Sequence, residues 1–154
     1  FGTRLMTEVR ETRGLAYGVS AGLAPLHPSA RVIGGTATRN ARVADSLAII
    51  RAEWRRMAEH GPSPAEITDA KAAIIGGYAL GLTDSPAIAR RLTGLQSLGL
   101  PISYFDDRPA RINAVTADDL RRIAKRLFQG DKLTIAVVGE PVGVTATDSL
   151  PALN

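Results

Sequence analysis

The sequence predicts an α+β fold in which helices pack on one face of an antiparallel-rich sheet. Residues 15–21 carry the period-two alternation of a half-buried strand, and residues 31–38 are predicted to form a second strand. The segments between residues 40 and 128 instead repeat apolar residues every three or four positions, as amphipathic helices do. Residues 132–139 form an apolar, β-branched run that is typical of a central strand. Strands at both ends of a helical middle therefore define the fold class.

The first part of the chain is predicted to be a short helix followed by two strands. The helix is expected over residues 3–13, with Gly14 as its C-terminal stop. The strand over residues 15–21 comes next, and two prolines indicate a loop over residues 23–30. The strand over residues 31–38 is then expected to lie antiparallel to the first.

A long helix is predicted from Asn40, a favourable N-cap residue, to Gly61. Its apolar residues are spaced by four, three, four and three positions, which places them on one face of an α-helix. They are Val43, Leu47, Ile50, Trp54 and Met57. This helix is therefore expected to bury one face against the sheet.

Local start and stop signals predict the remaining helices. Ser63 and Glu66 form a capping box before a helix that runs to about residue 82. Further helices are expected over residues 85–99, 104–114 and 116–128. The strand over residues 132–139 then closes the domain.

The pattern indicates one domain over residues 1–140 and a flexible tail over residues 141–154, which is rich in Pro, Gly, Thr and Ser. The chain opens on Phe1 and on a helix that has already begun. We therefore expect it to be part of a longer protein.

Composition argues against several classes of function. The net charge is +4, but the basic residues are scattered among acidic neighbours and aromatic residues make up only 5%. Solvated helix faces explain the arginines better than a nucleic-acid surface does. The chain has no cysteine, which excludes disulfides and thiolate zinc ligands. No apolar run approaches the length of about 20 residues that a membrane span needs.

Metal and serine-hydrolase chemistry are also poorly supported by the sequence. The only histidines are His27 and His60, and neither has a second histidine at helical spacing, as a catalytic zinc site requires. The run Gly18–Gly22 is similar to a nucleophile elbow, but it lies within an alternating strand and not at a strand-to-helix turn. The sequence therefore assigns no metal ligand and no nucleophile.

One pair of residues does suggest a site. Arg10 is expected in the last turn of the first helix and Tyr17 early in the next strand, with the Gly14 turn folding one back on the other. Arginine offers forked donors to carbonyls or a carboxylate, and a phenol hydroxyl can donate to a developing oxyanion. On spacing alone, the alternative is a surface ion pair between Arg10 and Glu8 or Glu11, with Tyr17 in the core.

Around these residues the sequence resembles the C-terminal domain of pitrilysin/insulinase-type zinc peptidases, the group that includes mitochondrial processing peptidase. The run from Arg4 to Tyr17 is strongly similar to that family's pattern. The likeness continues at residues 61–71, at residues 114–120 and at the apolar run 133–139, in the right order. The resemblance therefore extends over residues 3–140.

The resemblance implies a metallohydrolase-like fold from which one or more N-terminal strands are missing. In such peptidases one domain carries zinc and a homologous domain contributes an arginine and a tyrosine seven positions apart. Arg10 and Tyr17 match that pair, which implies substrate anchoring for Arg10 and carbonyl or oxyanion stabilisation for Tyr17. No zinc ligand has a counterpart here, so zinc is expected in the partner domain and no cofactor in this chain.

The resemblance leads to a first hypothesis: the chain is the zinc-free, substrate-contacting half of a zinc endopeptidase and is inactive alone. Its expected partners are a zinc-bearing homologous domain or subunit and a peptide substrate. An exposed sheet edge would also offer a route to a homodimer. The second hypothesis is a noncatalytic structural subunit of the same fold, and the third is an unrelated α+β binding module. Bacterial relatives of this kind are often exported, which favours the periplasm over the cytoplasm.

Overall fold

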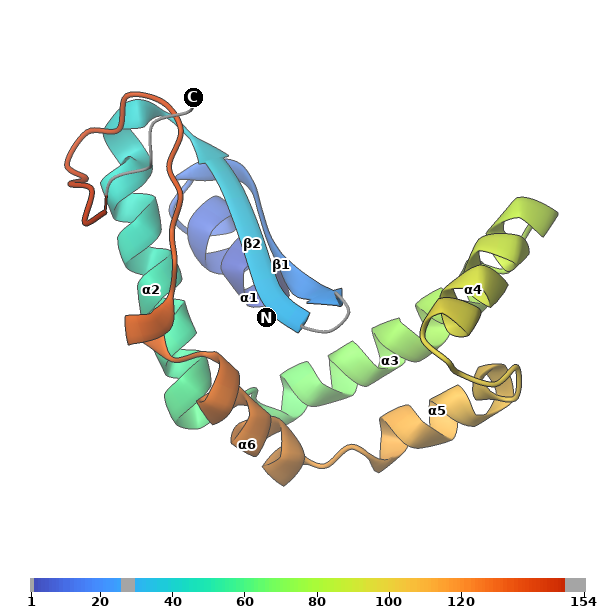
Figure 1. The fold of residues 1–154 in the computed structure, drawn as a ribbon. Helices are drawn as coiled ribbons and strands as arrows, with labels where there is room; N and C mark the ends of the chain where they lie inside the picture. The colour runs from blue at the N-terminus through green and yellow to red at the C-terminus, as the bar shows by residue number, and fades with distance from the viewer. Residues whose placement is uncertain (1, 26–29, 149–154) are drawn as a thin grey trace. The chain divides into compact units, whose positions relative to one another are not determined.

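A computed structural model of the chain describes residues 2–25 and 30–148, which form two compact units. Unit 1 contains the residues up to Glu59 and those from Ala124 onward, and unit 2 contains His60–Ile123. Both units are drawn in Figure 1. No helix in the described part of the chain is long and apolar enough to cross a membrane.

Unit 1 combines a hairpin with helices that cover one of its faces. Its first elements are α1 (Gly2–Leu5), the π-helical turn η1 (Met6–Glu11), β1 (Ala16–Pro25) and β2 (Ala30–Thr38). They are followed by the 3₁₀ turn η2 (Asn40–Arg42), the long helix α2 (Val43–His60) and, much later, the 3₁₀ turn η3 (Gly130–Lys132). The strands pair antiparallel from Ala16 opposite Thr38 to Pro25 opposite Ala30. The predicted antiparallel pairing is confirmed.

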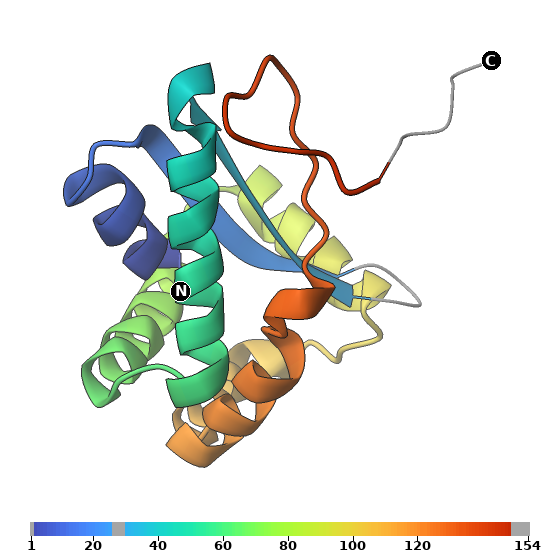
Figure 2. The same ribbon diagram turned by 90° about the vertical axis from the view of Figure 1, so that its left-hand side faces the viewer.

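The core of unit 1 lies between the hairpin and its helices (Figure 2). The buried cluster joins α1 and η1 to the first half of β1, and two isoleucines of α2 pack against it. Its members are Leu5, Val9, Leu15, Ala16 and Val19. Helices thus cover one face of an antiparallel sheet, as the sequence predicted.

Unit 2 consists of helices that begin and end where local signals predict. They are α3 (Pro64–Leu80), α4 (Ser85–Ser97), α5 (Tyr104–Ala114) and most of α6 (Ala117–Leu127). The capping box is reciprocal, because Ser63 N donates to Glu66 Oε2 at 2.7 Å and Glu66 N donates to Ser63 Oγ at 3.2 Å. Lys71 Nζ on α3 donates to the carbonyls of Asn113 and Val115, which ties α3 to the end of α5.

The prediction of a closing strand over residues 132–139 is wrong, because no strand forms there in this structure. Residues 133–139 have no regular secondary structure, and the sheet of the described residues contains only β1 and β2. The apolar, β-branched composition of this run favours a strand, but a strand forms only where another strand supplies hydrogen-bond partners. The burial pattern still alternates, with Leu133 and Ile135 half-buried and Thr134 and Ala136 exposed.

The predicted loop over residues 23–30 is also too long. Leu23 and Ala24 pair with Val32 and Arg31, and the ladder continues to Pro25 and Ala30. Proline is tolerated here because it is the last residue of its strand. The remaining residues of that loop, 26–29, lie outside the described part of the chain, and His27 is among them.

Candidate functional site

The candidate site is formed where η1 joins β1. The turn is wide, because Thr12 N donates to Thr7 O at 2.8 Å and Leu15 N donates to Val9 O at 2.9 Å. Gly14 closes it with a left-handed φ of +56°, a conformation that favours glycine. The chain therefore reverses between Arg10 and the start of β1, as the sequence predicted.

This reversal brings Arg10 and Tyr17 into contact. The guanidinium carbon of Arg10 lies 4.9 Å from the centroid of the Tyr17 ring, within the range of a cation–π interaction. Tyr17 is 88% exposed, so it is not a core residue. Glu8, one of the alternative partners for Arg10, forms an ion pair with Arg13. The structure thus brings together the two residues that the sequence singled out and leaves both side chains accessible to a ligand.

A β-bulge explains why Tyr17 faces solvent while its neighbours are buried. Ala16 pairs with Thr38 and Val19 pairs with Thr36, so two residues of β1 stand opposite one residue of β2. Ala16 and Val19 are 8% and 7% exposed, and Tyr17 lies between them on the opposite face. Bulges commonly redirect a side chain in this way.

Two threonines of β2 hold the main chain on either side of Tyr17. Thr38 Oγ1 donates to the carbonyl of Leu15 at 2.6 Å, and Thr36 Oγ1 donates to the carbonyl of Gly18 at 2.9 Å. Neither residue can be identified from the sequence alone, because its contribution depends on the strand register. A period-two spacing of threonines is too common in strands to have identified them.

Within the described ranges, the other candidates from the sequence contribute no site. Among residues 2–25 and 30–148, no three His, Asp or Glu side chains come together to hold a metal ion. His60 is exposed at the end of α2. Ser20, the middle residue of the elbow-like run, lies within β1 opposite Gly35.

Comparisons with known proteins show which family and fold the chain is similar to. The family model described as the peptidase M16 inactive domain matches residues 1–74. An uncharacterized zinc protease of Streptomyces coelicolor is 36% identical over 140 residues, which cover 89% of this chain and 30% of that protein. An uncharacterized zinc protease of Mycobacterium leprae is 38% identical over 126 residues, or 82% of this chain and 28% of that protein.

A solved structure shows the same fold. The crystal structure of a peptidase M16 inactive domain from Pseudomonas fluorescens aligns with a TM-score of 0.73 and 27% identity, covering 84% of this chain and 31% of that one. These features define the class of domain, which is the inactive domain of M16 peptidases. The chain belongs to the peptidase M16 family, as an inactive domain of that family. It spans about 30% of the length of the curated relatives it matches.

Proposed function

We propose that this chain is the substrate-contacting half of a zinc-dependent endopeptidase that cleaves peptides in a closed chamber. Residues 1–140 would form its peptidase domain and residues 141–154 its tail. The other half would be a zinc-bearing homologous domain that supplies the metal and the general base. Alone, this chain is then inactive. The observation that carries the proposal is the contact between Arg10 and an exposed Tyr17 on a pinned β-bulge.

The geometry suits an extended peptide. Arg10 presents several N–H donors, which can bind a peptide carbonyl or carboxylate while its carbon stays over the Tyr17 ring. The hydroxyl of Tyr17 is then available to donate a hydrogen bond to the scissile carbonyl oxygen as negative charge develops on it. On the same sheet face the positions nearest to Tyr17 are small, namely Ser20, Gly35 and Ala37, which leaves room for a peptide main chain. Farther along this face, Ile33 lies opposite Gly22 and is exposed.

The positive charge of Arg10 assists both roles. A guanidinium 4.9 Å from the phenol ring favours the build-up of negative charge on an oxygen that accepts from the Tyr17 hydroxyl. The hydroxyl acts only as charge develops, so Tyr17 mainly affects kcat. A residue that binds the substrate and the transition state equally well affects KM instead. We expect Arg10 to bind in this way, so its removal should mainly raise KM.

Peptide cleavage by the assembled, zinc-loaded protease tests the proposal, with and without a chelator. Tyr17→Phe keeps the ring and removes the hydroxyl, and we expect kcat to fall on the order of 10²–10³-fold. Arg10→Ala should raise KM more than it lowers kcat. The chain offers a matched control pair, because Arg111 lies 5.6 Å from the Tyr104 ring in unit 2. Tyr104→Phe and Arg111→Ala should leave cleavage unchanged.

Two outcomes would count against the proposal. A zinc-dependent protease that retains full kcat after Tyr17→Phe would remove the role assigned to the hydroxyl. A properly assembled, zinc-loaded complex that cleaves nothing in a varied peptide library would instead favour a noncatalytic structural subunit.

A second copy of this chain is the other partner expected from the sequence, through the exposed edge of the sheet.

A further inference from the structure

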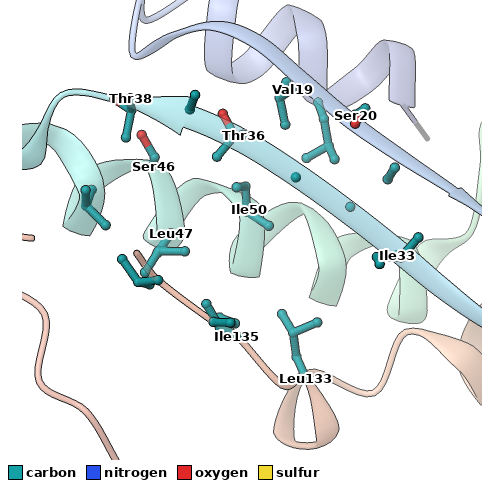
Figure 3. A pocket seen from close by; sticks show the side chains of 18 of the residues that line it. Val19, Ser20, Ile33, Thr36, Thr38, Ser46, Leu47, Ile50, Leu133 and Ile135 are labelled. Carbon is teal, nitrogen blue, oxygen red and sulfur yellow. The ribbon is translucent and has the colours of Figure 1, made fainter. Parts of the chain in front are cut away.

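The two residues of the candidate site are held in place by different parts of unit 1. The main chain around Tyr17 is held from the neighbouring strand by Thr36 and Thr38, which Figure 3 shows along β2. Arg10 lies in η1, and for the function proposed above its guanidinium has to stay beside the Tyr17 ring. The direction in which Arg10 points is therefore set by the turn that carries it.

This turn is one residue wider than a turn of α-helix. Thr12 N donates to Thr7 O, five positions back, whereas an α-helical hydrogen bond would join it to the carbonyl of Glu8. Turns of this π-helical kind are rare and occur frequently at functional sites. Because Arg10 lies between the two residues that this bond joins, the width of the turn determines where its side chain points.

The side chain of Arg13 binds the carbonyl that the narrower turn would use. Arg13 Nη1 donates to Glu8 O at 3.0 Å and also to the carboxylate oxygen Oε2 of Glu8. The next two carbonyls of the turn, those of Val9 and Arg10, accept from main-chain N–H groups at 2.9 Å. A carbonyl without a partner would favour a return to the α-helical bond. By satisfying Glu8 O from a side chain, Arg13 favours the wide turn.

Arg13 also keeps a competing charge away from Arg10. Glu8 lies two positions before Arg10, and an unpaired carboxylate there would attract the guanidinium of Arg10 away from Tyr17. The ion pair between Arg13 and Glu8 neutralises this carboxylate. In the described part of the chain Arg10 has no acidic partner, so its N–H donors remain available to a ligand.

We propose that Arg13 is a positioning residue for Arg10: by holding the main-chain and carboxylate oxygens of Glu8, it keeps η1 wide and Arg10 beside Tyr17. The inference rests on the peptide-binding role proposed for Arg10. The placement of the Arg10 side chain, however, is measurable without any substrate. Arg13 contacts no reacting group, so its whole effect on cleavage should pass through Arg10.

NMR of the longer zinc protease, with nitrogen-15-labelled arginine, follows the placement of Arg10. The ring current of Tyr17 displaces the Nε–Hε signal of a guanidinium that lies beside it, and Tyr17→Leu provides the undisplaced reference. Arg13→Met keeps an unbranched side chain but has no N–H donor, so it should move the Arg10 signal most of the way to this reference. Arg13→Lys keeps the charge and donors for Glu8, and it should retain most of the displacement.

A double-mutant cycle in the assembled, zinc-loaded protease tests whether Arg13 acts through Arg10. Arg13→Met should raise KM on the order of 10-fold, with a smaller effect on kcat. In an Arg10→Ala background the same change should alter KM by less than about twofold, because the residue that Arg13 positions is already absent. The matched control is Arg122→Met, which removes a 68% exposed arginine paired with Asp119 and should change neither KM nor the Arg10 signal.

Three results would overturn the inference. An Arg10 signal that stays in place after Arg13→Met would show that the turn keeps its width without this side chain. Equal effects of Arg13→Met on KM with and without Arg10 would show that Arg13 acts on the domain as a whole. A loss after Arg13→Lys as large as after Arg13→Met would exclude its charge and donors as the cause. If Arg10→Ala itself leaves KM unchanged, the binding role of Arg10 fails, and the NMR signal still decides whether Arg13 positions it.

Discussion

The buried carboxylate of Glu53 links α2 to the helix that leads into the candidate site. Its Oε2 lies 3.9 Å from Nε of Arg4 and 3.4 Å from Nε of Arg56. The side chains of Arg4 and Glu53 are 8% and 9% exposed, whereas that of Arg56 is 51% exposed. Glu53→Gln keeps the shape of the side chain but leaves the charge of Arg4 buried without this carboxylate. We therefore expect a large loss of stability.

The size of the loss follows from the burial of the pair. Removing one partner of a buried ion pair costs about 3–5 kcal/mol, whereas an exposed pair contributes about 0–1 kcal/mol. The distance of 3.9 Å between Arg4 and Glu53 is long for an ion pair, and Arg56 is half exposed. Both facts favour the lower end, about 3 kcal/mol. With a urea m-value of about 2 kcal/mol/M, the unfolding midpoint should fall by about 1.5 M.

Urea unfolding followed by fluorescence measures this change in unit 1 directly. Trp54 is the only tryptophan, is 7% exposed and packs 4.6 Å from the ring of Phe128. The matched control is Asp45→Asn, because Asp45 is also an acidic residue of α2 in an ion pair, with Arg42, but its side chain is 62% exposed. That change should cost no more than about 0.5 kcal/mol. If Glu53→Gln lowers the midpoint no further than Asp45→Asn does, the argument from burial is wrong.

Three further predictions concern unit 2. Gly61 has a φ of +68°, and a Cβ there would lie 2.9 Å from Arg121 Cγ. Gly61→Ala should therefore lower the free energy of unfolding by about 1–2 kcal/mol, measured by urea titrations followed by circular dichroism. In the same assay Gly76→Ala should raise the free energy of unfolding by about 0.8 kcal/mol, because Gly76 is helical and a Cβ there meets nothing within 4 Å. A lower free energy of unfolding in this variant would contradict the prediction. A hydrogen bond from the Thr116 side chain, aided by Arg122, lowers the pKa of Asp119 from 3.8 to about 2. Because the folded-state pKa lies below the unfolded value, the cap stabilises the fold above about pH 4 and weakens as the pH falls toward 2. Thr116→Val should raise the pKa of Asp119 toward 3.8 in a carbon-13 NMR titration, and an unchanged midpoint would contradict the assignment.

Helices were predictable from the sequence because their signals are local. The capping box of Ser63 and Glu66 needs only residues three positions apart, and it forms as the sequence predicted. Gly61 and Gly99 end their helices with φ values of +68° and +65°. The π-helical turn η1, in which Thr12 N donates to Thr7 O, has no comparable local signal in the sequence.

Strands were less predictable because each depends on a partner elsewhere. Residues 132–139 have the composition of a central strand, yet they form none here, since no neighbouring strand is present beside them among the described residues. Leu23 to Pro25 look like a loop in the sequence, yet they are paired because β2 continues back to Ala30. A strand pattern therefore predicts a preference, and pairing decides the outcome.

The same distinction explains how much of the candidate site was predictable. The proximity of Arg10 and Tyr17 followed from one glycine turn between neighbouring elements. The bulge that turns Tyr17 outward did not, because it arises from the register of β1 against Thr36 and Thr38. Those threonines are recognisable only once the register is known.

The candidate site alternates buried residues with exposed ones along the chain. Val9, directly before Arg10, is fully buried, and Ala16, directly before Tyr17, is 8% exposed. Arg10 and Tyr17 are therefore carried by main chain that the core holds in place, while their own side chains contribute little to the core. Removing the hydroxyl of Tyr17 should leave the free energy of unfolding nearly unchanged, whereas truncating Val9 to alanine should cost on the order of 2 kcal/mol. Loss of cleavage after Tyr17→Phe would thus report on the chemistry of the site and not on the folding of the domain.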